Sequence, residues 1–460
     1  MGLLMKITIA LPYLSRQRDS FFREGIGKFL GLLVEGIFQD DSEIQIEVWS
    51  YFQGIDSIQT LFNEHFCDRN CRITIINDFD EYKKSRHYKH QLKRGEDDKK
   101  IQDDFENMLA HKIGIFSKVR SRCLKFIQRY YLIRAIRKRS KADFVYYNNP
   151  IFFPLLCIIK PTIVQIHDLF TMQYEKEFIN NNKYYFWANR KVSCWLGIQG
   201  LQGAHFVCSS YNTLNKQVLK YIPFIKKNRT HVVRFPSMVK DYGGKTSLTK
   251  KEFCSKYGIT QAYIAYPTQN RPNKNIITLL RALDYLNDHN IGIQLVITGK
   301  FNEVKECEQY IKNHESVARM LVETGNLSEE ELYMLYKYSD MVVSTSFVEG
   351  GCISGQVLEA LKIGNVPVIC ALLDGIDEWL KVHNMDRSSA DMNWFDRYDY
   401  IGLAERIKDV LNNQEKHINK QRHIFNDLNE QTWDVTGKEY LGIIKNMIDV
   451  NRKDKGGKAK

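Results

Sequence analysis

The sequence predicts an α/β protein with two doubly wound domains, each built on a parallel sheet. Short apolar, β-branched runs alternate with helix-length segments along most of the chain, an order typical of parallel sheets covered by helices. The chain also has 460 residues, which is more than one hydrophobic core usually holds. Because 43% of the residues are apolar and only 9 are proline, most of the chain is expected to fold.

The first half contains the strands of the first predicted domain. Its strand-like runs cover residues 6–10, 44–49, 72–76, 144–147, 162–166 and 204–208. Helix-length segments separate most of them, which predicts a doubly wound sheet over residues 1–242. We place the boundary in the polar, glycine-containing stretch 240–245, so the second domain covers residues 243–430.

The second half repeats a strand, loop and helix order. Strand-like runs end near residues 266, 297, 323 and 345. Ser328 and Glu331 fit the S-x-x-E capping box, which predicts a helix start just after the loop that carries Asn326 and Leu327. Ligands of open α/β sheets bind beyond the carboxyl ends of the strands, so these loops are expected to line one crevice.

A glycine-rich turn separates two carboxylates, Glu349 and Glu359. The apolar run 341–345 predicts a buried strand and residues 356–362 have helical spacing. The turn between them carries Gly351, Cys352, Ile353, Ser354 and Gly355. Backbone N–H groups at such a turn suit anions, whereas carboxylates bind hydroxyls. A nucleotide-sugar carries both kinds of group; the alternative is an ordinary glycine-rich turn with solvated glutamates.

Two cations, Arg271 and Lys274, lie on the loop after the first strand of the second domain. Arginine binds phosphate through its bidentate fork and lysine binds it as a point charge. Together they could clamp a diphosphate in the same crevice.

These motifs resemble the retaining glycosyltransferases of family 4 (glycosyl transferases group 1), which have the GT-B fold of two facing Rossmann-like domains. The matching segments are 266–275, 324–332, 346–350, 357–360, 364–369 and 432–440. They cover most of residues 260–443. In the first half, residues 23–29, which include Gly27, resemble the family's glycine-rich loop, and residues 162–168 resemble its strand that ends in His-Asp.

The resemblance implies transfer of a hexose from a nucleotide-sugar to a glycan or lipid-linked acceptor, in surface polysaccharide, lipopolysaccharide or glycolipid biosynthesis. Residues 1–242 would hold the acceptor and residues 243–430 the donor. A helix within residues 431–450 would cross back onto the first domain, and the charged tail 451–460 is expected to be disordered. The alternatives are a non-catalytic GT-B scaffold of a polysaccharide-assembly complex and a sugar-nucleotide epimerase.

The resemblance and the charges also imply residue roles. Lys274 and Arg271 would stabilise the leaving diphosphate, Glu349 would bind a sugar hydroxyl and Glu359 the ribose. The backbone amides of Gly351 to Gly355 would hold the sugar or phosphate, and Asn326 and Leu327 would border the base. His167 would contact the donor sugar; the alternative is a structural role, which is the more common one for a lone histidine at a strand end. The loop 25–28, with Gly27, would face the acceptor.

Two departures from the family pattern stand out. Nine residues, 350–358, separate Glu349 from Glu359, where the family motif has seven. Thr268 and Gln269 occupy the place of a Gly-Arg pair that many relatives carry, so Arg271 would replace that arginine.

The net charge of +12 is concentrated in one segment. Residues 111–142 contain 11 lysines and arginines and no acidic residue. Lys118, Arg122, Lys125 and Arg129 share one helical face beside an apolar face, which predicts that the segment from Lys118 to Lys141 binds an anionic membrane surface. The alternatives are a solvated helix face and a nucleic-acid patch; no nucleic-acid partner is expected.

Ten cysteines occur without a C-x-x-C pair, which indicates reduced thiols in a cytosolic protein. No Asp-x-Asp triad stands at a suitable place, so neither a metal nor another cofactor is expected. No apolar run is long enough to span a bilayer, and no signal peptide is apparent. The expected location is cytoplasmic, peripheral at the inner face of the membrane.

Overall fold

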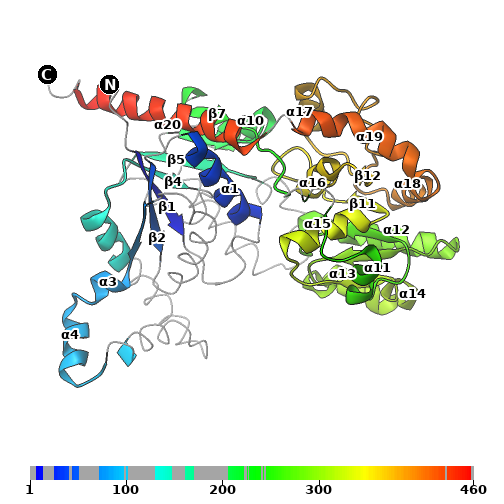
Figure 1. Cartoon of the computed structure of the whole chain (residues 1–460), viewed down its shortest axis with the longest axis horizontal. Coiled ribbons are helices and arrows are strands. Elements are labelled where there is room, and N and C mark those ends of the chain that lie inside the picture. Colours follow the sequence, from blue (N-terminus) through cyan, green and yellow to red (C-terminus); the bar gives the residue numbers. More distant parts are fainter. Residues whose placement is uncertain are drawn as a thin grey trace.

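In the structure, which is a computed structural model, the chain forms two parallel sheets (Figure 1). The described residues are 7–13, 25–40, 44–50, 72–97, 100–101, 130–147, 161–169, 206–221, 225, 227–239, 242, 245–429 and 432–456. The statements below on structure concern these residues.

The first sheet has seven strands in the order β3-β2-β1-β4-β5-β6-β7, and every neighbouring pair is parallel. Its strands are β1 (Ile7–Tyr13), β2 (Ile44–Ser50), β3 (Arg72–Asn77), β4 (Phe144–Tyr147), β5 (Thr162–Ile166), β6 (Phe206–Ser209) and β7 (Thr230–Val232). The described helices of this half include α1 (Gly25–Asp40), α3 (Phe79–Tyr82), α4 (Arg86–Lys93), α10 (Asn212–Tyr221) and a helix over residues 130–139. The six predicted strands are therefore present, and β7 is an additional edge strand.

The second sheet has five parallel strands in the order β10-β9-β8-β11-β12. They are β8 (Tyr263–Tyr266), β9 (Gln294–Ile297), β10 (Leu321–Glu323), β11 (Met341–Ser344) and β12 (Val368–Cys370). The helices are α11 (Lys250–Tyr257), α12 (Ile276–Asp288), α13 (Lys305–Asn313), α14 (Glu315–Ala318), α15 (Glu329–Tyr338), α16 (Gly355–Ile363), α17 (Ile376–Val382), α18 (Tyr400–Asn412) and α19 (Gln414–Asn429). Every residue of β8, β9, β11 and β12 is buried, as expected of central strands covered on both faces.

The last helix, α20 (Trp433–Gly456), lies along α1 of the first half (Figure 1). At the crossing, a Cβ at Gly437 would lie 2.4 Å from the backbone of Gly36, so only glycine permits this approach. The predicted return of the C-terminal helix is confirmed. The helix runs past residue 450 into the tail that was expected to be disordered, because residues 443–455 contain neither glycine nor proline.

The loops that carry the predicted site residues follow the carboxyl ends of β5, β8, β10 and β11.

The predicted domain boundary at residue 242 falls between β7 and α11 and stays a prediction. Among the described residues, no helix combines the length and apolar character needed to cross a membrane.

Candidate active site

The centre of the site is a partly buried ion pair between two predicted residues. Lys274 Nζ lies 2.6 Å from Glu349 Oε1, and the two side chains are 14% and 15% exposed. Lys274 ends the short helix η6 (Pro272–Lys274) after β8, and Glu349 follows β11, the next strand in the sheet. Burial alone would lower the pKa of Lys274, but the attraction of Glu349 and, less, of Tyr266 raises it above its ordinary value. The ammonium is therefore charged at neutral pH.

Buried hydroxyls hold this ion pair in place. Thr345 Oγ1 donates to the carbonyl oxygen of Lys274 at 2.8 Å, and Tyr266 donates to the same oxygen at 3.1 Å. Ser346 Oγ donates to Glu349 Oε1 at 2.5 Å and lies 3.0 Å from the Tyr266 hydroxyl. Sequence reasoning gave no role to Thr345, Tyr266 or Ser346, although Tyr266 and Ser346 lie in segments that resemble the family. The run of Ser344, Thr345 and Ser346 at the end of an apolar strand was the available signal.

The glycine-rich turn presents its backbone rather than its side chains. Cys352 and Ile353 are buried in the second-domain core, and Cys352 has a positive φ of 63°. Ser354 is buried and caps α16 by accepting from the N–H of Val357 at 3.3 Å. Burial, with a smaller contribution from Glu378, raises the pKa of Cys352 to about 12, so its thiol stays neutral. The polar groups that this turn offers to a ligand are therefore on its main chain, beside the neutral Cys352 thiol at the interdomain cleft.

Open space lies at the start of α16. A Cβ at Gly355, the first residue of this helix, would meet nothing within 4 Å. The first amides of a helix have no intrahelical partner, so this end is suited to an anion. Further along α16, Glu359 Oε2 accepts from the buried Tyr336 hydroxyl at 2.5 Å.

The remaining predicted donor-side residues lie on exposed loops. Arg271 is exposed, and its Nη2 donates to Gln269 Oε1 at 2.6 Å. Asn326 is exposed and Leu327 is half-buried on the loop between β10 and α15. The capping box that places this loop is present, with Ser328 and Glu331 bonded reciprocally.

His167, at the end of β5, lies against the glycine-rich turn of the other domain. A Cβ at Gly350 would stand 1.7 Å from the carbonyl oxygen of His167, and Ser210 Oγ donates to the carbonyl of Gly350 at 2.9 Å. The His167 ring packs edge-on against Phe29 of α1 at 4.9 Å between centroids. The predicted loop 25–28 is wrong: Gly25, Gly27 and Lys28 form the first turn of α1. The helix forms despite its glycines because Phe29, Leu33, Val34 and Ile37 recur at helical spacing and are buried in the core of the first domain.

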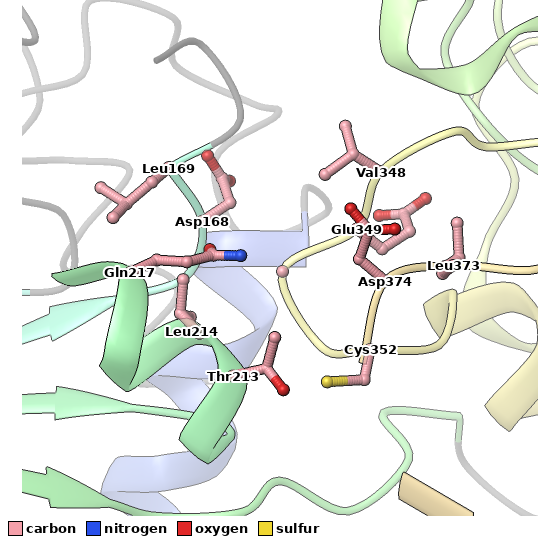
Figure 2. A pocket seen from close by; sticks show the side chains of 11 residues that line it. Asp168, Leu169, Thr213, Leu214, Gln217, Val348, Glu349, Cys352, Leu373 and Asp374 are labelled. Carbon is pink, nitrogen blue, oxygen red and sulfur yellow. The ribbon is translucent and has the colours of Figure 1, made fainter. Parts of the chain in front are cut away.

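A small cleft lies between the two domains. One wall is formed by Asp168, Leu169, Thr213, Leu214 and Gln217, and the other by Val348, Glu349, Gly350, Cys352, Leu373 and Asp374 (Figure 2). Arg397 supports the second wall: its Nη1 donates to Phe347 O at 2.7 Å and its Nη2 to Asp374 Oδ1 at 2.8 Å. Apart from Glu349, Gly350 and Cys352, most of these residues carry no local motif, and sequence reasoning did not single them out.

The comparisons with known proteins agree with this geometry. Residues 250–426 match the family model Glycosyl transferases group 1. The chain contains a glycosyl transferases group 1 domain. The match spans the second sheet, the Lys274–Glu349 pair and the turn before α16. No curated protein sequence matches the chain significantly.

Similar solved structures extend over nearly the whole chain. HepE of Anabaena, solved with UDP and glucose, has a TM-score of 0.62 at 12% identity and aligns over 96% of this chain and 100% of its own. Sucrose-phosphate synthase of Thermosynechococcus elongatus has a TM-score of 0.63 at 11% identity, over 97% and 100%. WaaG, described as a glycosyltransferase of lipopolysaccharide biosynthesis, has a TM-score of 0.58 at 11% identity, over 95% and 99%. The predicted fold class, GT-B, is confirmed.

Proposed function

We propose that the protein is a retaining glycosyltransferase of family 4 that moves a hexose from a nucleotide-sugar to a glycan or lipid-linked acceptor. The main support is the Lys274–Glu349 pair at the edge of the interdomain cleft, inside the matched family segment. A structural neighbour was solved with UDP and glucose, so UDP-hexoses are the first donors to test. The WaaG likeness supports surface polysaccharide or lipopolysaccharide as the acceptor class.

The proposed chemistry follows from the charges. The leaving nucleoside diphosphate gains negative charge as the glycosidic bond breaks, and a fixed cation beside it stabilises that transition state. Lys274 supplies this cation, with Arg271 at the edge of the site and the amides before α16 as further donors. Glu349 balances Lys274 while the donor is absent and accepts a sugar hydroxyl when the donor is bound. Glu359 accepts the ribose hydroxyls, and His167 borders the sugar from the first domain.

In this proposal Lys274 and the backbone amides before α16 stabilise the negative charge of the diphosphate, so no essential metal or other cofactor is required. Within the described residues, no group of three or more metal-ligating side chains is found. The acceptor binds on the first-domain side of the cleft.

The deciding experiment replaces Lys274 with alanine and measures sugar transfer from UDP-hexoses. Loss of a well-placed charge-stabilising donor lowers the turnover number by about a hundredfold or more, and Lys274→Arg restores only part of it because the guanidinium is wider and planar. Lys408→Ala, at an exposed position on α18, is the matched control and keeps full turnover. A Lys274→Ala enzyme that changes only the Michaelis constant would refute the catalytic role.

The two alternatives give different results with the unmodified protein. A non-catalytic scaffold binds no nucleotide-sugar in a thermal-shift panel. An epimerase releases a free epimerised sugar or nucleotide-sugar. Transfer to an acceptor, or slow donor hydrolysis, supports the glycosyltransferase.

We also propose a cytoplasmic location with attachment to the inner face of the membrane through the segment Lys118 to Lys141. Residues 118–129 lie outside the described residues. In the helix over 130–139, Leu132, Ala135 and Ile136 are buried in the protein core, so this part meets lipid only through its cations and the exposed Tyr130. Arg134 and Lys138 lie 3.4 Å from the buried carboxylate of Glu81, which weakens their attraction to a membrane.

Nearby, α4 adds cations that support the membrane proposal. Arg86, Lys89, Lys93 and Arg94 are exposed on a segment that extends away from the first sheet (Figure 1). Cations near anionic lipid contribute about 1 kcal/mol each. Replacing Lys118, Arg122, Lys125 and Arg129 with glutamine is expected to release the protein from phosphatidylserine vesicles; unchanged co-sedimentation at moderate salt contradicts this.

A further inference from the structure

A carboxylate of the second domain caps a helix of the first domain. Glu378, on α17, accepts from the backbone N–H groups of Asn212 and Thr213 at 2.7 Å each. It also accepts from the Thr213 hydroxyl at 2.7 Å. Asn212 and Thr213 are the first two residues of α10, and such amides have no partner within their own helix. The cap of α10 is therefore supplied from a segment 165 residues away in the chain.

The charge of Glu378 suits this position. A carboxylate at a helix N-terminus is favoured by the helix dipole, and hydrogen bonds to an ionised group are the stronger kind. Burial alone would raise the pKa of Glu378, but the bonds from Thr213 and Asn212 outweigh it and lower the pKa below its ordinary value. The side chain is thus ionised at neutral pH and attracts the N-terminus of α10.

The cap lies beside a second set of contacts between the domains. Gly375, just before α17, has a φ of 89°, and a Cβ there would lie 3.3 Å from Thr213 Oγ1 and 2.7 Å from Cys352 Sγ. Ser210, two residues before α10, donates to Gly350 of the glycine-rich turn. The start of α17, the glycine-rich turn and the start of α10 therefore meet at one place.

We propose that Glu378 is an interdomain latch that holds the cleft in its closed form. Thr213 and Cys352 line the cleft on opposite walls (Figure 2), and Thr213 is at the same time bonded to Glu378. Separation of the walls at this point breaks the bonds of Glu378 together with the Ser210–Gly350 bond. Glu378 is thus a positioning residue that acts through α10 and sets the distance between the walls.

The latch does not depend on the reaction proposed above, because it rests on contacts within the protein. The latch predicts coupling between the two walls: loss of the cap on α10 loosens the glycine-rich turn of the opposite wall as well. A simple helix cap would loosen α10 alone.

The test is amide hydrogen exchange on the full chain, without donor or acceptor. Glu378→Gln keeps the side-chain shape and removes its charge, and Glu378→Ala removes the acceptor. In peptides spanning residues 206–221, exchange is expected to become at least tenfold faster in both variants. In peptides spanning residues 345–355, exchange is expected to rise as well, and the radius of gyration measured by X-ray scattering is expected to increase.

Asp377→Asn is the matched control. Asp377 precedes Glu378 on α17 and carries the same charge, but it pairs with Arg387 of its own domain at 2.7 Å and 2.9 Å. This control is expected to leave both exchange rates and the radius of gyration unchanged. Thr213→Val, which removes only the hydroxyl donor, is expected to give a smaller increase than Glu378→Ala.

Two outcomes would overturn the latch. Unchanged exchange of residues 206–221 in Glu378→Ala would mean that Glu378 does not hold α10 in solution. Faster exchange of residues 206–221 alone, with residues 345–355 and the radius of gyration unchanged, would reduce Glu378 to a local cap. Neither readout involves sugar transfer, so failure of the latch is distinguishable from failure of the proposed function.

Discussion

A single methyl group at Gly350 tests whether the closed contact between the domains is needed for activity. In the structure, a Cβ at this position would stand 1.7 Å from the carbonyl oxygen of His167 and 2.7 Å from its carbonyl carbon. Both are backbone atoms at the end of β5, so neither can rotate away. Gly350 itself has no positive φ, and alanine can adopt its backbone conformation within the second domain. The clash in Gly350→Ala therefore acts on the contact between Gly350 and His167, which joins the two domains.

The size of the effect follows from this distance. Real Cβ contacts essentially never fall below 3.0 Å, so the two walls must move apart by more than 1 Å in Gly350→Ala. A misplacement of about 1 Å can cost roughly a hundredfold in rate. Lys274, Glu359 and the turn before α16 all belong to the second domain and stay in place, so nucleotide affinity is expected to change little.

The assay compares one turnover rate and one nucleotide affinity between wild type and each variant. Turnover is measured with saturating donor and acceptor, and nucleotide binding is measured by calorimetry. Gly442→Ala, on α20, is the control, because a Cβ there would meet nothing within 4 Å. Full turnover by Gly350→Ala would show that the working enzyme does not form this contact, and the closed arrangement would then have no catalytic meaning.

Three further predictions concern stability and nucleotide binding. Lys256 holds the pKa of Glu331 at about 2 against burial, from an ordinary 4.5. Ionised Glu331 stabilises the fold by about 1–2 kcal/mol. This contribution is complete above pH 4.5 and disappears as the pH falls toward 2. The free energies of urea unfolding of Glu331→Gln and wild type should therefore converge at acid pH, and a difference that stays constant with pH contradicts the assignment. Gly437→Ala would place a Cβ 2.4 Å from the backbone of Gly36 and should destabilise the fold by about 1–3 kcal/mol in thermal unfolding, and an unchanged melting temperature would refute the close crossing. Glu359→Gln should weaken nucleotide binding by about 1.5–3 kcal/mol in calorimetry, and equal affinity would remove Glu359 from the ribose site.

Local patterns predicted the strands and the helix starts because those depend on residues close in sequence. The strands 162–166 and 144–147 were predicted with their observed bounds, and the capping box of Ser328 marked the start of α15. The edge strand β7 was missed because its three residues, Thr230, His231 and Val232, are half-buried and carry no apolar run. The loop expected at residues 25–28 is helical because it begins a helix whose apolar face is buried in the first core.

The site was predicted in its residue types but not in its contacts. Lys274 and Glu349 were both named, yet their ion pair joins residues 75 positions apart, and no local pattern contains that distance. The partners of Glu378 on α10 and the support of Asp374 by Arg397 are also long-range. The contacts of Glu378 arise when the two domains meet, and the other two arise when separate loops of the second domain pack together. All three follow from the three-dimensional arrangement and not from periodicity or spacing.

The crossing of α1 and α20 has a consequence for how the chain folds during synthesis. The core of the first domain includes Leu33 and Ile37 of α1 together with residues of the last helix, Tyr440, Leu441, Ile444 and Met447. The Tyr440 hydroxyl also donates to the buried Gln165 of β5. On the ribosome, the first domain emerges before these side chains exist, and its apolar surface stays uncovered while the whole second domain is made. The second domain can complete its own core first, so the part of the protein that is translated earliest is the part that finishes folding last.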